Sequence, residues 1–235
     1  MPVVESVRAE GGSAEYAHLD LSSLSSTRRA AEAMASAGSE VRVLVNNAGI
    51  GLGRGVTEDG FEIHFGVNHL GHYLLTDLLA PVMGPGARVV TVASAAHHNA
   101  DGGDLENVLG RTRSLLGWRE YAASKLANVL FSRELARRRP DLGAHAVHPG
   151  LVDTPLVPRW VRPFIRGRML TPAEGADTVV WCCLADEVAG ATGLYYWQRR
   201  AVEPSAAGRS DGLAAELWER SAAWAHAGAG GLKPG

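Results

Sequence analysis

Short β-branched runs alternate with amphipathic segments along most of this chain. The apolar runs end in Gly, Pro, Asn or Asp, whereas the segments between them repeat apolar residues at helical spacing. This alternation is typical of a parallel sheet with helical crossovers. The pattern predicts strands over 15–19, 41–45, 88–93, 143–148 and 193–197, and helices over 22–37, 61–79, 118–138, 172–185 and 211–224.

The size and composition of the chain fit a single α/β domain. With 235 residues, of which 46% are hydrophobic and 20% charged, the chain is long enough to bury one large core. We expect one domain over residues 1–224 and a loose Gly/Ala-rich tail over 225–235. The net charge of −2 gives no general electrostatic basis for binding nucleic acid or an anionic membrane.

The cysteine, histidine and hydropathy patterns argue against a disulfide, a metal site and a membrane span. The two cysteines, Cys182 and Cys183, are adjacent in an apolar run and are interpreted as reduced core residues. The nine histidines show no ligand spacing, so no metal site is predicted. Neither a secretory leader nor an apolar run long enough to span a membrane is found, which predicts a cytoplasmic protein.

Polar groups follow several of the predicted strands. They are Asp20, Asn46-Asn47-Ala48-Gly49, Ser94 and Pro149-Gly150. Ligands of doubly wound sheets bind at the carboxyl ends of the strands, so these groups are expected on one edge. Each has a plainer interpretation when taken alone, since Asp and Ser cap helices and Asn and Gly form turns.

Tyr121 and Lys125 are the strongest pair of chemical groups in the sequence. Residues four apart on a helix share one face, so the lysine ammonium is expected beside the phenol. A neighbouring positive charge favours the phenolate and makes the tyrosine an acid or base near neutral pH. This chemistry suits the interconversion of an alcohol and a carbonyl, which also requires a hydride carrier.

In combination and in chain order, these motifs resemble the short-chain dehydrogenases/reductases. The matches are Asp20-Leu21, Asn46-Asn47-Ala48-Gly49, Asn68, Ser94, Tyr121-x-x-x-Lys125 and Pro149-Gly150 with Thr154. The stretch 121–131 looks more specifically like the branch of retinol dehydrogenases and WW-domain oxidoreductases, as do residues 92–97, 148–150 and 203–205. The resemblance covers residues 5–222 and implies a doubly wound, Rossmann-like sheet.

The resemblance also implies a role for each matching residue. Tyr121 would exchange a proton with the substrate oxygen, Ser94 would polarise the carbonyl, and Lys125 would lower the pKa of the tyrosine and hold the nicotinamide ribose. The backbone of Asn68 would hold a water in a proton relay to Lys125. The remaining cofactor contacts would come from Asp20, Leu21, Asn47, Ala48, Gly49, Pro149, Gly150, Val152 and Thr154.

The family begins with a strand, a Thr-Gly-x-x-x-Gly-x-Gly turn, a helix and a second strand, and this sequence contains no such unit. Gly11 and Gly12 follow no strand and open no helix, and residues 1–10 look like the end of a helix. Absence of the unit, about 30 residues, would leave a gap of roughly 10 Å beside strand 41–45 and expose a hydrophobic edge. Either 15–19 fills the gap, or a partner chain covers the edge, or the chain begins too late.

The expected function is hydride transfer between a nicotinamide cofactor and an apolar small-molecule alcohol or carbonyl. NADP is implied by the resemblance, with NAD as the alternative, or no nucleotide if nothing replaces the missing loop. The same Ser, Tyr and Lys would also serve a non-redox enzyme catalysing an aldol-like, dehydration or cyclisation step, and a non-catalytic remnant is the third alternative. A homodimer or homotetramer is implied by the resemblance alone.

Two further segments have open interpretations. Residues 155–170 contain Arg159, Arg162, Arg166 and Arg168 with apolar neighbours, at the position of the family's substrate lid. A lid, a membrane-surface patch and a solvated loop remain alternatives for this segment. His97 and His98 either line the substrate pocket or are polar loop residues.

Overall fold

A five-stranded sheet forms the centre of the molecule. The computed structural model describes residues 2–154, 167 and 169–227. Strands β1 (Val43–Asn46), β2 (Arg88–Val92), β3 (Gly143–His148) and β4 (Leu194–Trp197) are parallel and adjacent in that order. The short β5 (Arg200–Ala201) pairs antiparallel with β4. The parallel sheet confirms the predicted α/β class.

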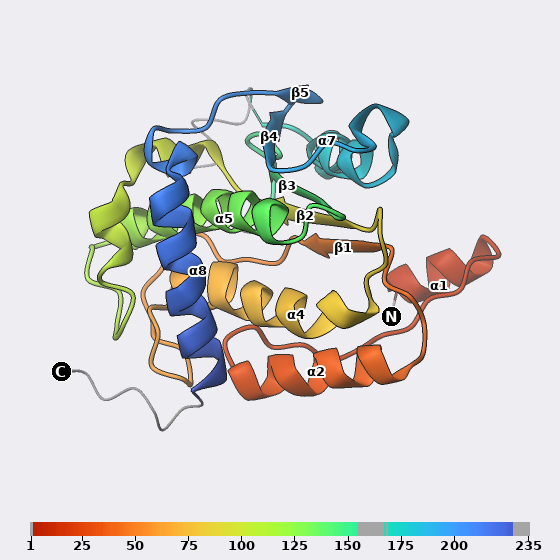
Figure 1. Cartoon of the computed structure of the whole chain (residues 1–235), viewed down its shortest axis with the longest axis horizontal. Helices are drawn as coiled ribbons and strands as arrows, with labels where there is room; N and C mark the ends of the chain where they lie inside the picture. Colours follow the sequence, from red (N-terminus) through yellow and green to blue (C-terminus); the bar gives the residue numbers. More distant parts are fainter. Residues whose placement is uncertain (1, 155–166, 168, 228–235) are drawn as a thin grey trace.

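Helices cover the two faces of the sheet unequally (Figure 1). One face carries α4 (Gly71–Leu79) and α5 (Trp118–Arg138), flanked by α2 (Leu24–Ser36) and α8 (Asp211–His226). The other face carries α7 (Pro172–Leu184), which packs against β2 and β3. The main core lies under α4 and α5, and a smaller apolar cluster lies between the sheet and α7.

Local sequence signals set the ends of these helices. Ser23 caps α2 by accepting a hydrogen bond from the backbone N–H of Ser26. Thr171 and Glu174 form a capping box around the start of α7, and Pro172 occupies its first turn. The predicted bounds of α5 and β3 match the structure residue for residue, and those of the other predicted helices and strands, except 15–19, hold to within about three residues.

The predicted helix over 61–79 contains an irregular turn. It consists of α3 (Ile63–Phe65), a π-helical segment η1 (Gly66–Leu70) and α4. Such π segments occur often at functional sites, and this one carries Asn68. Short 3₁₀ turns are η2 (Ala80–Val82), η3 (Ala95–Asn99), η4 (Gly102–Leu105), η6 (Asp186–Val188) and η7 (Ala207–Arg209).

The prediction of a strand over 15–19 is wrong. Residues 12–20 adopt no regular structure, whereas α1 (Pro2–Ala9) confirms the helix expected over 1–10. A strand needs a neighbour for its backbone hydrogen bonds, and none of the described strands lies beside 15–19. This segment therefore does not fill the gap beside β1. The expected exposed edge is present, because Val43 and Val45 of β1 are 37% and 40% exposed.

The cysteines, the C-terminal tail and the lid segment were also predicted from the sequence. Cys182 is buried and Cys183 half-buried, and both are free thiols, as interpreted from the sequence. The predicted tail begins within α8, which continues to His226, and residues 228–235 lie outside the described residues. Most of the predicted lid, 155–166 and 168, also lies outside them.

Candidate active site

The first turns of α5 bring Tyr121 and Lys125 to the carboxyl edge of the sheet. The Lys125 ammonium nitrogen lies 5.7 Å from the centroid of the Tyr121 ring. Its Nζ donates a hydrogen bond of 2.9 Å to the carbonyl oxygen of Val92, the last residue of β2. The same carbonyl accepts a 3.1 Å bond from Asn128 one turn further along α5. The helical spacing predicted from the sequence therefore places both side chains together.

Ser94 reaches the same edge from the end of β2. It caps η3, where its Oγ accepts a 3.2 Å hydrogen bond from the backbone N–H of Ala96. The Ser94 side chain also lies close enough to Tyr121 to lower the pKa of its phenol. The structure thus joins Ser94, Tyr121 and Lys125 in one site, as the sequence predicted.

Burial sets the protonation behaviour of the two α5 side chains. Burial raises the pKa of the Tyr121 phenol, and the contact with Ser94 lowers it by less. This direction is opposite to the lowered pKa expected from the sequence, because removing the phenolate from water outweighs the stabilising contact. Burial also lowers the pKa of Lys125 to about 8. Lys125 therefore exchanges its proton closer to neutral pH than a solvated lysine does.

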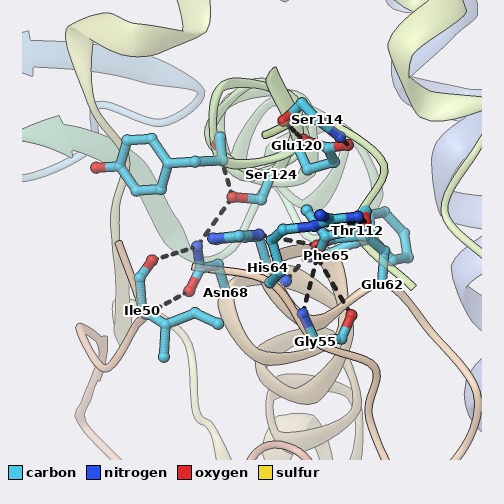
Figure 2. A network of polar contacts seen from close by, with 12 residues as sticks. Ile50, Gly55, Glu62, His64, Phe65, Asn68, Thr112, Ser114, Glu120 and Ser124 are labelled. Atoms are coloured by element: carbon cyan, nitrogen blue, oxygen red, sulfur yellow. Dashed lines mark hydrogen bonds and ion pairs between the residues drawn. The ribbon is translucent and has the colours of Figure 1, made fainter. Parts of the chain in front are cut away.

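Asn68 fastens the loop after β1 to α5. Its side-chain oxygen accepts a 2.8 Å bond from the N–H of Ile50, and its amide nitrogen donates to the Ile50 carbonyl at 3.1 Å. The same nitrogen donates to Ser124 Oγ at 2.9 Å, and Ser124 donates in turn to the Tyr121 carbonyl at 2.8 Å (Figure 2). Through these bonds the loop and the tyrosine's helix are held as one unit.

The backbone of Asn68 contacts a histidine that sequence reasoning missed. The Asn68 carbonyl oxygen accepts a 3.0 Å bond from Nδ1 of His72. Burial lowers the pKa of His72 to about 4, so this ring is neutral at neutral pH. The predicted water on this carbonyl would have to share the oxygen with His72. The four-residue spacing on the helix was the available signal.

The cofactor residues predicted at the end of β1 lie open and next to Lys125. Asn47 and Ala48 are exposed, whereas the preceding Asn46 is buried and donates to Thr76 Oγ1 at 3.0 Å. A Cβ on Gly49 would lie 3.0 Å from Asn68 Oδ1 and 3.8 Å from Lys125 Nζ. Absence of a side chain at Gly49 thus leaves a shallow cradle beside the lysine. This cradle fits the ribose of a nicotinamide nucleotide.

A second group of predicted cofactor residues follows β3. Gly150 has a positive φ of 87°, and a Cβ there would lie 2.6 Å from Leu170 Cδ1. Val152 pairs with Leu170, and the Asp153 N–H donates to the Leu170 carbonyl at 2.9 Å. These contacts hold the loop from Pro149 to Thr154 at the edge where β3 ends.

Asp20 and Leu21 are held by local contacts. Asp20 Oδ1 accepts bonds from the N–H (2.9 Å) and hydroxyl (2.7 Å) of Ser22, and these hydrogen bonds keep the pKa of Asp20 below its usual value. The buried Leu21 packs against Gly71 of α4. These contacts form a capped turn before α2, and the cofactor contact expected of this pair stays a prediction.

A cavity of about 490 Å³ opens at the same carboxyl edge. Its walls come from the ends of β3 and β4 and from α7, and they include His148, Pro149, Leu170, Thr178 and Trp197. His97 is buried, with its Nδ1 on the Ser94 carbonyl at 2.7 Å and its Nε2 accepting the Ser205 N–H at 3.0 Å. It is thus a structural residue behind Ser94, while His98 is exposed.

Two absences complete the description of the site. Within the described ranges, no three His, Cys, Asp or Glu residues gather in a group that would hold a metal ion. None of the helices described here is long and apolar enough to cross a membrane.

Comparison with known proteins places the chain in a family. A protein-family model described as "Enoyl-(Acyl carrier protein) reductase" matches residues 1–195. Polyprenol dehydrogenase from Mus musculus is 40% identical over 97% of this chain and 73% of its own length. Retinol dehydrogenase 12 from Homo sapiens is 40% identical over 86% of this chain and 67% of its own length.

Solved structures agree with these sequence relatives. The crystal structure of a protein from Mycobacterium Paratuberculosis superposes with a TM-score of 0.75 at 33% identity, covering 94% of this chain and 79% of that one. A short-chain dehydrogenase from Burkholderia cenocepacia J2315 in complex with NADP shares the fold, with a TM-score of 0.66 at 22% identity over 83% of this chain and 78% of that one. The chain belongs to the short-chain dehydrogenase/reductase family and is a nicotinamide-dependent oxidoreductase of that family.

Proposed function

We propose that this protein interconverts a long-chain apolar alcohol of isoprenoid type and its carbonyl form, with NADP as the hydride carrier. The observation that supports it is the assembly of Ser94, Tyr121 and Lys125 on one edge, tied by Asn68 to the loop after β1. NADP rather than NAD follows from the branch resemblance. A cytoplasmic location and a homodimer or homotetramer are kept as expectations of the same resemblance.

In this proposal the residues of the chain handle the proton and the cofactor's position. Tyr121 transfers a proton between its hydroxyl and the substrate oxygen, while Ser94 donates a hydrogen bond that polarises the same oxygen. Lys125, whose pKa is about 8, supplies a positive charge next to the phenol. It also supplies a proton that restores the Tyr121 hydroxyl after the tyrosine has given its own proton to the substrate. When bound, the nicotinamide gives or takes the hydride.

The residues after β1 and β3 are suited to hold the nicotinamide half of the cofactor. Asn47, Ala48 and Gly49 present exposed backbone next to Lys125, and Pro149 to Thr154 form a loop across the edge from them. Asp20 and Leu21 would contact the adenine of the cofactor only from the solvent-facing side of the capped turn before α2. Binding therefore depends mainly on the loops after β1 and β3.

The cavity beside Pro149 suits the apolar part of a substrate. Its volume of about 490 Å³ falls within the range of small-molecule sites, and Trp197 and Leu170 give it apolar surface beside the polar groups of Glu174, Asp177, Gln198 and Arg199. Two relatives are a polyprenol dehydrogenase and a retinol dehydrogenase, both named for isoprenoid alcohols. Polyprenol, retinol and their aldehydes are therefore the first substrates to assay.

A cofactor and substrate screen tests this proposal. The purified chain is mixed with NADPH or NADH and each aldehyde, and with the oxidised nucleotides and each alcohol, while nucleotide fluorescence is followed. We expect turnover that prefers the NADP couple. Binding of neither nucleotide at millimolar concentration, by quenching of tryptophan fluorescence, would overturn the proposal.

A further inference from the structure

A buried polar cluster lies next to the site and belongs to none of the residues assigned above. The side chains of Glu62 and His64 are 3% and 0% exposed. Glu62 Oε2 accepts the backbone N–H groups of His64 at 2.9 Å and Phe65 at 3.0 Å, capping α3. Its Oε1 lies 2.8 Å from His64 Nδ1 and accepts the hydroxyl of Thr112 (Figure 2). A carboxylate with four such partners is fully satisfied.

The contacts of the His64 ring indicate its charge. Nδ1 faces the Glu62 carboxylate, and Nε2 faces the carbonyl oxygen of Gly51. The Gly51 carbonyl only accepts, so Nε2 donates to it, and an ionised Glu62 takes a second hydrogen bond from Nδ1. Glu62 and His64 are therefore best described as a carboxylate–imidazolium pair, in which each charge is compensated by hydrogen bonds.

The pair joins two segments that meet at the active site. The Gly55 N–H donates to Thr112 Oγ1 at 3.0 Å, and the Arg54 guanidinium donates to the Thr112 carbonyl at 3.1 Å. Further along, the Gly53 N–H donates to the Leu116 carbonyl at 3.0 Å. The loop after β1 is thus bonded along its length to the segment that leads into α5.

The His64 ring also contacts the start of the helix that carries Tyr121. Gly117 caps α5 with a positive φ of 72°, and its carbonyl accepts the Tyr121 N–H at 2.8 Å. A Cβ on Gly117 would lie 2.5 Å from His64 Cε1, so the ring is packed directly against this residue. The centroids of the His64 and Tyr121 rings are 6.3 Å apart, with the rings edge to face.

We propose that Glu62 and His64 are positioning residues for Tyr121, which act as a buried ion pair that holds the loop after β1 against the first turn of α5. The proposal rests on the proposed function, since it assigns Tyr121 the proton transfer. The charged and titratable groups around the pair are Tyr121 on α5 and Arg54 on the loop, whereas Glu120 of α5 is occupied by Ser114 and the Arg113 N–H.

Three variants separate the parts of this proposal. His64→Gln removes the imidazolium and the contact with Gly51. Glu62→Gln is isosteric: its amide can donate to a neutral His64 and to Thr112, so the hydrogen bonds remain while the charges are lost. His69→Gln is the matched control, because His69 is buried on η1, which continues directly from α3, but contacts Ser221 of α8 at 2.9 Å.

The first readout needs no turnover. Nitrogen-15 NMR of histidine side chains in the full chain, assigned with His64→Gln, should show both His64 nitrogens protonated at neutral pH, and only one in Glu62→Gln. Carbon-13 NMR titration of Tyr121, assigned with Tyr121→Phe, should show its midpoint rise by about one pH unit in His64→Gln. The midpoint rises because His64→Gln removes the positive charge and leaves the Glu62 carboxylate uncompensated near the phenol; a neighbouring opposite charge shifts a pKa by about one to three units. His69→Gln should leave the midpoint unchanged.

The second readout is kinetic. His64→Gln should lower kcat about tenfold or more at nearly unchanged substrate KM, because displacement of a reacting group costs rate rather than binding. Glu62→Gln should lose less and should fold even if His64→Gln does not. A neutral His64 in the wild type, or an unchanged Tyr121 midpoint in both variants, would overturn the proposal. Absence of turnover in the wild type would instead refute the proposed function, while the NMR titrations still test the pair.

Discussion

Replacement of Asn68 by Ala tests the connection between the loop after β1 and α5. The Asn68 side chain is fully buried and makes three hydrogen bonds, two to the backbone of Ile50 and one to Ser124. Substitution leaves the Ile50 N–H and carbonyl without their partners and opens a small cavity. We expect both lower stability and weaker nucleotide binding, since the loop carrying Gly49 loses its attachment.

The size of the effect follows from the number of bonds and their exposure. Each hydrogen bond contributes about 0.5–1.5 kcal/mol net, which gives about 3 kcal/mol for three. Ile50 is half-buried, so in the variant water can form hydrogen bonds with its N–H and carbonyl groups and recover part of this free energy. Ser124 keeps its own bond to the Tyr121 carbonyl. The cavity left by the Asn68 side chain costs stability and offsets the hydrogen bonds that Ile50 and Ser124 recover or keep. The free energy of unfolding should therefore fall by about 2–3 kcal/mol.

Urea unfolding followed by tryptophan fluorescence measures this change, and NADPH titration measures the binding. Asn107→Ala is the control, because Asn107 is exposed and makes one side-chain bond to Arg113. Its stability should change by less than about 0.5 kcal/mol. Equal unfolding midpoints for Asn68→Ala and Asn107→Ala would refute the reasoning.

Two further predictions concern a buried charge and a close contact. The pKa of Lys125 falls from 10.5 to about 8 on folding, so the folded chain binds fewer protons between these values and its stability should rise with pH there, by an amount on the order of 3 kcal/mol. Lys125→Met should lack this rise in stability. Parallel curves of stability against pH for both proteins would show that burial of the Lys125 charge does not cost free energy of folding. Gly66→Ala should destabilise by about 1–3 kcal/mol in urea unfolding, because its Cβ would lie 2.3 Å from Thr57 Cγ2. Gly212→Ala on α8, with open space around it, should stabilise the protein by about 0.5–1 kcal/mol. If Gly212→Ala instead lost as much stability as Gly66→Ala, steric contact of the new Cβ would not explain whether such a substitution stabilises or destabilises.

Local pattern was sufficient for most of the sheet and its helices. α5 and β3 were bounded correctly because their signals are local: amphipathic spacing for one, and a short Ala-His-Ala-Val run stopped by Pro149-Gly150 for the other. Residues 15–19 have a similar local pattern but no adjacent strand, so they do not form one. Strand formation depends on a partner, which a window of sequence does not contain.

The candidate site was predictable in its residues but not in its connections. Tyr121, Lys125 and Ser94 meet because helical spacing and strand ends place them on one edge. The π segment at Asn68 and the raised pKa of Tyr121 arise from packing and burial, which no motif encodes. Glu62 lies inside the helix predicted over 61–79 and belongs to no motif. Only the fold shows that Thr112, 50 residues later, buries its carboxylate.

The structure also bears on the alternatives left by the sequence. Ser94, Tyr121 and Lys125 meet at one edge of the sheet, and sequence relatives are named dehydrogenases. A non-redox enzyme or a non-catalytic remnant gains no support from them. The exposed edge of β1 is the feature that sets this chain's sheet apart from the doubly wound sheet implied by the resemblance.

The most direct test of the central claim is transfer of labelled hydride. Purified protein is incubated with NADPH carrying deuterium at the reactive carbon and with retinal or a polyprenal, and the alcohol product is analysed by mass spectrometry. The account predicts one deuterium at the carbinol carbon with wild type and with Tyr16→Phe, whose tyrosine is exposed and remote in the chain, and none above background with Tyr121→Phe. Deuterium transfer by Tyr121→Phe at the wild-type rate would contradict it.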